Sequence, residues 1–183
     1  IYVINRAERN DRWETFQRIN SDLFGKFEVE RWEATSTSPQ IPSTVDAIFQ
    51  SFLNCLDQSL ESQECVIVME DDSYLAEGGM EKLETVWKDL PEDWDVLVGN
   101  HYFFGQMNIL TDNLAKPVQR ASTINFSIFR KTCLPKIKEY RYLRDVYPSI
   151  RDFDHYVTSE IIPINNHTVW PMISREIPSF SDH

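Results

Sequence analysis

The sequence predicts an α/β fold: a central, mostly parallel mixed sheet flanked by helices. Short apolar segments alternate with amphipathic segments along the 183 residues, which is the pattern of strands joined by right-handed helical crossovers. The most apolar segment, residues 65–69, ends directly in three carboxylates. Ligands bind at the carboxyl ends of the strands in such sheets, so we expect the functional site at that edge.

The N-terminal part begins with a strand, a helix and a second strand. Residues 1–4 (IYVI) are apolar without alternation, as expected for a strand buried on both faces. A helix follows to about residue 23, capped by Asn10 or Asp11 and ended by Gly25. Alternation with period two over residues 27–32 predicts the second strand.

A polar loop over residues 35–43 leads to a helix over 44–60, because apolar residues recur there at helical spacing. Residues 65–69 follow as the central strand. The later expected elements are a helix over 81–90, strands over 94–98, 102–104 and 124–129, a helix over 131–140 with Pro135 in its first turn, and a helix over 154–159. Residues 105–116 and 142–150 are expected to be loops that determine specificity.

Composition excludes several classes of partner. Lys and Arg number 18 against 29 Asp and Glu, a formal net charge of −11 at pH 7, so we expect no nucleic-acid partner. Three dispersed cysteines do not make a disulfide framework or a zinc site, which favours reduced thiols and a soluble, cytoplasmic protein. No apolar run approaches the ~18 residues of a transmembrane segment.

Three consecutive carboxylates, Glu70, Asp71 and Asp72, follow the central strand. Like charges this close destabilise the fold unless a cation neutralises them, and oxygen ligands suit Mn²⁺ or Mg²⁺. Alternation along an extended chain directs Glu70 and Asp72 to one side, toward a metal, and Asp71 to the other, toward basic or backbone partners. A solvated acidic loop is the alternative interpretation.

Arg6, Arg9 and Arg12 follow the first strand at three-residue spacing and are expected to share a face of an early helical turn. Guanidinium groups pair with pyrophosphate, and Arg6 is the first candidate for this role. Surface ion pairs with neighbouring acids are the alternative for Arg9 and Arg12. The candidates for a base pocket, all at the ends of adjacent strands, are Asn5, Ala34 and Thr35.

The segment VIVMEDD at residues 66–72 resembles the acidic DxD motif of GT-A fold glycosyltransferases, most closely lipooligosaccharide-type family 25 and similar small enzymes of chlorella viruses. Residues 3–6 with 11–12 resemble the family's opening N-L-x-R and D-R segment. Later segments that resemble the family in order are 122–130, 153–157 and 169–182. In the family's G-x-x-x-S-H helix the chain keeps Ser51 but has Ala47 and Phe52 in place of Gly and His.

The resemblance implies one GT-A (Rossmann-like nucleotide-binding) domain over residues 1–183, alone or within a longer polypeptide. It implies transfer of a sugar from a nucleotide diphosphate donor, usually a UDP-sugar, to a glycan or glycoprotein hydroxyl, with Mn²⁺ or Mg²⁺ between the phosphates and the acidic motif. Asp72 is then the first metal ligand, Glu70 the second and His183 a third, while Ser51 and Asp71 belong to the nucleotide site. If a virus encodes the chain, the host cytoplasm is the expected location.

An inverting transfer needs a carboxylate that takes the proton of the acceptor hydroxyl. Asp154 and Asp152 are the candidates, and Asp154 matches the family's pattern better. The alternative for Asp154 is an acid in the first turn of a helix, and a retaining transfer needs no such base.

Two other functions stay open. One is a catalytically inactive nucleotide- or sugar-binding domain retained for interaction. The other is a metal-dependent nucleotidyl or phosphoryl transferase, which usually needs a second acidic cluster or a Gly-rich phosphate loop; the chain has only 5 glycines. A Rossmann dehydrogenase is disfavoured because residues 5–9, after the first strand, contain no glycine.

Overall fold

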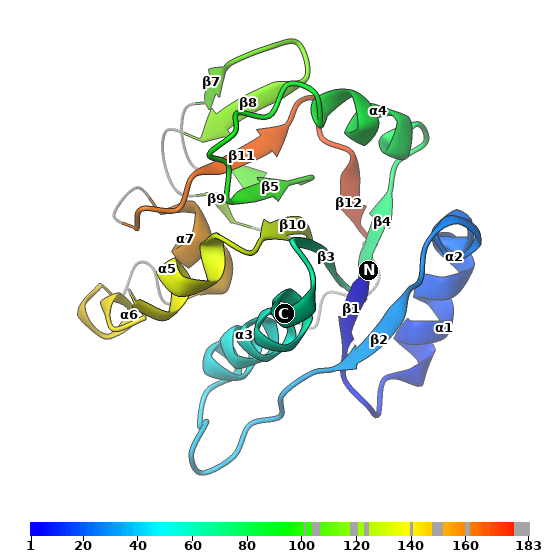
Figure 1. Cartoon of the computed structure of the whole chain (residues 1–183). Helices are drawn as coiled ribbons and strands as arrows, with labels where there is room; N and C mark the ends of the chain where they lie inside the picture. Colours follow the sequence, from blue (N-terminus) through cyan, green and yellow to red (C-terminus); the bar gives the residue numbers. More distant parts are fainter. Residues whose placement is uncertain are drawn as a thin grey trace.

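The computed structural model describes residues 1–100, 107–117, 125–139, 141–147, 152–159 and 162–177, and the backbone of 102–103 and 121–122. These residues form a mixed α/β structure whose large sheet carries helices on both faces (Figure 1). The predicted fold class is confirmed at this level. Across these residues, no helix is both long enough and apolar enough to cross a bilayer.

The large sheet has eight strands and is mixed. In spatial order they are β2 (Glu30–Glu33), β1 (Tyr2–Asn5), β3 (Cys65–Glu70), β10 (Phe126–Arg130), β5 (Val96–Val98), β11 (Asn166–Val169), β8 (Leu114–Pro117) and β7 (Met107–Ile109). Strand β1 is parallel to β2 and β3, β11 is parallel to β5, and β10 is antiparallel to both β3 and β5. The carboxyl ends of β1, β2, β3, β5 and β11 therefore share one edge.

Two small antiparallel pairs stand apart from the large sheet. Strand β4 (Ser73–Leu75) pairs with β12 (Ser174–Glu176), and β6 (Tyr102–Phe103) pairs with β9 (Ala121–Ser122). The expectation of loops over residues 105–116 and 142–150 is wrong, because β7, most of β8 and a short helix lie there. Strands β4, β11 and β12 were also unpredicted, since each is only 3 or 4 residues long.

Seven helices occur in the described part of the chain. They are α1 (Asn10–Ile19), α2 (Ser21–Lys26), α3 (Thr44–Ser62), α4 (Gly79–Val86), α5 (Cys133–Glu139), α6 (Leu143–Val146) and α7 (Phe153–Thr158). Pro135 lies in the first turn of α5, as predicted. The single helix ended by Gly25 is wrong: the helix breaks at Asn20, and Gly25 lies inside α2.

The break at Asn20 has a local cause. The Asn20 side chain donates to the carbonyl oxygens of Phe16 and Ser73 and accepts from the Leu75 backbone N–H. These bonds tie the end of α1 to strand β4, while the Asn20 backbone N–H still donates to the Phe16 carbonyl at 2.9 Å. Strand β4 directly follows the acidic motif, so the contact with Asn20 anchors the chain on the C-terminal side of that motif.

The core lies on both faces of the large sheet. Val66 and Val68 of β3 pack in the cluster that contains α3, α5 and α7, whereas Met69 packs with α1, α2 and α4. Figure 1 shows these two groups of helices on opposite sides of the strands. Successive strand residues point to opposite faces, so Glu70, the last residue of β3, belongs to the face covered by α3 and α7.

Candidate functional site

The acidic motif occupies the turn between β3 and β4. Glu70 ends the strand, Asp71 and Asp72 form the turn, and Ser73 Oγ donates to the Glu70 carbonyl at 2.8 Å. Because the strand ends at Glu70, its alternation does not extend to the next two residues. Asp71 and Asp72 both contact Arg12, so the expectation that they face opposite sides is wrong.

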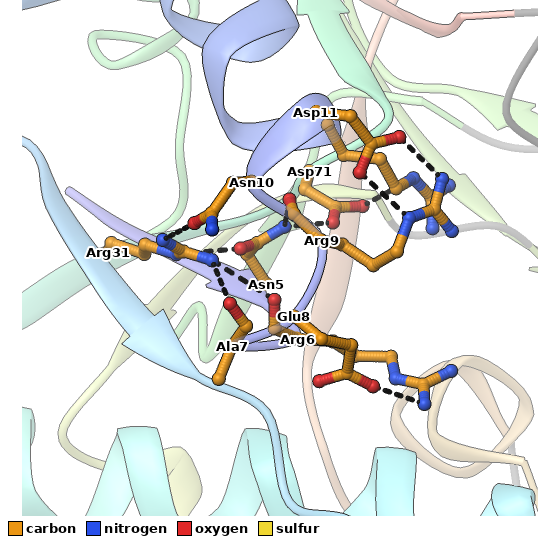
Figure 2. A network of polar contacts seen from close by, with 10 residues as sticks. Asn5, Arg6, Ala7, Glu8, Arg9, Asn10, Asp11, Arg31 and Asp71 are labelled. Carbon is orange, nitrogen blue, oxygen red and sulfur yellow. Dashed lines mark hydrogen bonds and ion pairs between the residues drawn. The ribbon is translucent and has the colours of Figure 1, made fainter.

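Asp71 is buried and held by two side chains. Asn5 Nδ2 donates to its Oδ2 at 2.5 Å, a contact that Figure 2 shows, and Arg12 Nε lies 3.4 Å from its Oδ1. Arg12 Nη2 donates to Asp72 Oδ2 at 3.2 Å. The Arg12 side chain is only 10% exposed, so one buried guanidinium compensates two carboxylates.

Burial and neighbouring charges disfavour ionisation in this turn. Burial raises the pKa of Glu70 well above its usual range, and the charges of Asp72 and Asp154 raise it further. Burial also raises the pKa of Asp72 to about 6, against the lowering effect of Arg12. The carboxyl group of Glu176, in β12, acts on both. The turn is therefore short of positive charge.

This donor set fits a hard divalent cation. The charges of Asp71, Asp72, Asp154 and Glu176 all act on Glu70, and Arg12 supplies a guanidinium to Asp71 and Asp72. Among the described residues, Asp72 Oδ1 is buried without a hydrogen-bond partner. Oxygen donors with excess negative charge suit Mg²⁺ or Mn²⁺. The predicted ligand His183 lies outside the described residues.

Glu176 was missed by sequence reasoning. It belongs to a three-residue strand and lies opposite Ser73 in the antiparallel pair of β12 and β4. The Ile177 backbone N–H donates to the Asp72 carbonyl at 2.6 Å. The pairing of β12 with β4 joins residues about a hundred positions apart in the sequence. No local pattern around Glu176 predicts this pairing.

Asp152 and Asp154 lie at the start of α7, where Asp152 is the residue before the first helical turn. His155 Nδ1 lies 3.3 Å from Asp152 Oδ2, and Asp154 Oδ1 accepts from the His155 backbone N–H at 2.8 Å. One potential ligand atom from each of these three residues lies within 4.8 Å of the others. The charge of Asp154 acts on Glu70, so α7 brings this acid toward the acidic turn.

Of the predicted base-pocket residues, Asn5 ends β1, whereas Ala34 and Thr35 follow β2. The Ala34 backbone N–H donates to the Asn5 carbonyl at 3.0 Å, and that of Thr35 donates to Ser51 Oγ at 2.8 Å. Ser51 is buried and its hydroxyl donates to the Ala47 carbonyl at 2.7 Å. Ser51 therefore connects helix α3 to the backbone of the loop, and its hydroxyl is engaged in that connection.

The three arginines do not share a helix face. Helix α1 begins at Asn10, so Arg6 and Arg9 precede it. Arg6 is exposed and forms an ion pair with Glu8 (Figure 2). Arg9 pairs with Asp11, as the alternative interpretation expects. Arg12 reaches the acidic turn.

Two buried asparagines, Asn100 and Asn125, lie at the edge of the sheet that carries the acidic turn. The Glu70 backbone N–H donates to the Asn125 carbonyl at 2.9 Å, and Asn100 Nδ2 donates to Asn125 Oδ1 at 3.3 Å. Within the described part of the chain, the buried Asn125 Nδ2 has no hydrogen-bond partner. The sequence predicted a strand over residues 124–129 but did not single out these amides. His101, next to Asn100, lies outside the described residues.

No family model and no curated protein matches the chain. Among solved structures, it is similar to a glycosyltransferase involved in the glycosylation of the major capsid of PBCV-1, with a TM-score of 0.58 and 14% identity over 91% of this chain and 78% of that chain. It is also similar to A197 from STIV, with a TM-score of 0.49 and 13% identity over the same shares. The first likeness shows a glycosyltransferase-like fold. The extent of a single GT-A domain stays a prediction.

Proposed function

We propose that the chain is a glycosyltransferase that moves a sugar from a nucleotide diphosphate donor, a UDP-sugar first, to a hydroxyl of a glycan or glycoprotein. The observation that carries this proposal is the acidic turn Glu70–Asp72 at the carboxyl end of the central strand, in a fold similar to that of a glycosyltransferase. Five carboxyl groups gathered there are costly to the fold. A divalent cation would offset that cost and would also bind the diphosphate of the donor.

Asp72 and Glu70 would hold Mn²⁺ or Mg²⁺, and Glu176 lies where it can contribute. When bound, the cation supplies positive charge that stabilises the departing diphosphate more in the transition state than in the ground state. Asp71 is engaged by Asn5 and Arg12 and keeps the turn in place.

The nucleotide would lie along the ends of β1 and β2. Asn5 ends β1, and Ala34 and Thr35 follow β2 with their backbone held by Asn5 and Ser51. The exposed guanidinium of Arg6 is free to exchange Glu8 for a phosphate, because an exposed ion pair is worth about 1 kcal/mol or less.

Asp154 is the candidate base. It would accept the proton of the acceptor hydroxyl as that oxygen attacks the anomeric carbon and the bond to the diphosphate breaks. Asp152 pairs with His155 and would orient the first turn of α7. The stereochemistry of the product tests this role of Asp154, because only an inverting transfer needs the base.

The proposal is tested with a panel of nucleotide sugars, following release of nucleoside diphosphate in Mn²⁺ and in EDTA. We expect release from one donor in Mn²⁺ only, and a loss of about 100-fold or more in Asp72→Asn. Asp57→Asn is the matched control, because Asp57 is an exposed α3 carboxylate paired with Lys138. Binding without turnover would favour an inactive interaction domain, and release of pyrophosphate would favour a nucleotidyl transferase.

A further inference from the structure

We propose that Arg31, in strand β2, is a positioning residue of the acidic turn: its guanidinium orients the side-chain amide of Asn5, and Asn5 in turn holds Asp71. No pattern in the sequence singles out Arg31. Its consequence for turnover rests on the proposed function, whereas its effect on the Asn5 amide can be measured without any ligand.

Arg31 distributes its donors over the segment that joins β1 to α1 (Figure 2). Its acceptors are Asn5 Oδ1 at 2.7 Å, Asn10 Oδ1 at 2.7 Å, and the carbonyl oxygens of Arg6 and Ala7 at 3.1 and 3.0 Å. The guanidinium carbon also lies 5.8 Å from the centre of the Trp13 ring. One planar group on the neighbouring strand thus fixes four acceptors of this segment.

The contact with Asn5 decides which way its amide points. The two ends of an asparagine amide have nearly the same shape, but one accepts and the other donates. Arg31 can only donate and an ionised Asp71 can only accept, so the amide has one satisfied orientation. In that orientation Nδ2 donates to Asp71 Oδ2 at 2.5 Å and to the Arg9 carbonyl at 3.2 Å.

The orientation of Asn5 reaches the site through Asp71. Asp71 shares the Arg12 guanidinium with Asp72, so a change in the Asp71 carboxylate alters how Arg12 meets Asp72. While Asn5 and Arg12 hold Asp71, Asp72 Oδ1 is left without a hydrogen-bond partner among the described residues. Arg31 thereby helps to determine which oxygen the turn offers to a cation.

A lysine cannot replace Arg31 in this role. Its ammonium is a point charge on a flexible stem and cannot meet several acceptors in one plane. Arg31→Lys therefore keeps the positive charge but removes the planar set of N–H donors. Arg130→Lys is the matched control, because Arg130 also donates to a backbone carbonyl, that of Glu92, and its guanidinium lies 5.9 Å from the Trp94 ring centre. Arg130 ends β10 and lies beside Cys65, the first residue of β3, so it is at the other end of the strands from the acidic turn.

The first measurement is solvent exchange of the Asn5 side-chain amide protons by ¹⁵N NMR. We expect slow exchange in the wild type and in Arg130→Lys, and exchange at least 10-fold faster in Arg31→Lys. Unchanged exchange in Arg31→Lys would overturn the proposal. If Arg31→Lys does not fold, Arg31→Gln, which keeps one donor toward Asn5, is measured in the same way.

The second measurement is binding of Mn²⁺ alone by electron paramagnetic resonance. We expect about 10-fold weaker binding in Arg31→Lys and in Asn5→Ala. The double variant should show no further loss, because both changes break the same chain of hydrogen bonds from Arg31 through Asn5 to Asp71. Additive losses would show that Arg31 does not act through Asn5 and would overturn the proposal. If the wild type binds no Mn²⁺, the metal dependence of the proposed function fails, and amide exchange still decides the role of Arg31.

Discussion

At the residue scale, the acidic turn makes the metal-free protein sensitive to pH. The folded-state pKa of Asp72 is raised to about 6, whereas an ordinary Asp has a pKa of about 3.9. Between these values the native state binds more protons than the unfolded state, so the free energy of unfolding falls as the pH rises. The raised pKa of Glu70 acts in the same direction.

We therefore expect the free energy of unfolding in EDTA to fall by about 1 kcal/mol between pH 5 and 7.5 through Asp72. Asp72→Asn cannot ionise and should lose less over this interval. Urea unfolding of both proteins at the two pH values measures the difference. Equal losses in the two proteins would show that Asp72 is ionised throughout.

Arg12 is the counter-ion of this turn, and its removal leaves two carboxylates without it. Arg12→Met keeps most of the side-chain volume, and we expect it to destabilise the protein by about 3 kcal/mol at pH 7.5, and by less at pH 5, where Asp72 is largely protonated. Arg6→Met is the control, because Arg6 forms an exposed pair with Glu8 worth about 1 kcal/mol or less. Similar losses for the two variants in urea unfolding would contradict the assignment.

Part of the candidate site could be predicted from the local sequence. The motif Glu70–Asp72 lies where the apolar run predicts, because a buried strand that ends in three acids is a local signal. Arg31, Asn125 and Glu176 could not be found in this way. Each depends on a segment that is distant in the sequence: Arg31 lies beside β1, Asn125 accepts from the Glu70 backbone N–H, and Glu176 pairs with β4. Residues of these types are also common on protein surfaces, so none stands out in the sequence.

At the element scale, the end of β5 depends on a close approach at Gly99. A Cβ there would lie 2.7 Å from Phe126 Cδ1 and 3.1 Å from Ile173 Cγ1, and both neighbours are buried. The Gly99 carbonyl also accepts from the backbone N–H groups of Ile173 and Ser174. Gly99 thus permits β5, β10 and the segment leading to β12 to meet beside the acidic turn.

Gly99→Ala should destabilise the protein by about 1–3 kcal/mol, because the buried Phe126 ring has to move. Gly25→Ala provides the opposite case. Apart from the adjacent residues and the backbone of the same helix, no atom lies within 4 Å of the added methyl group. Gly25 is inside helix α2, where alanine is favoured by about 0.5–1 kcal/mol. Thermal unfolding of the two variants measures both signs, and destabilisation of Gly25→Ala would contradict the described α2.

Prediction of the elements succeeded where the local pattern is long. The apolar stripe of α3 and the run of β3 each contain enough residues to show their period. Strands β7 and β12 were missed because they are 3 residues long and their side chains are largely polar or exposed. Such strands are defined by their partners β8 and β4, which lie elsewhere in the chain.

At the scale of the whole molecule, the fold gathers carboxylates that are remote in the chain. β3 supplies Glu70, α7 supplies Asp154 and β12 supplies Glu176, and their charges act on one another. The chain is strongly acidic as a whole, with a net charge of −11. An anionic donor is repelled by this field, so we propose that its binding requires a cation at the turn.

Calorimetric titration of UDP into the protein, in Mn²⁺ and in EDTA, tests whether a cation is required. We predict binding in Mn²⁺, none in EDTA, and loss of binding in Asp72→Ala, while Asp57→Ala, which alters the exposed pair with Lys138, binds as the wild type does. Equal binding in Mn²⁺ and EDTA, or no binding in either, would contradict the account.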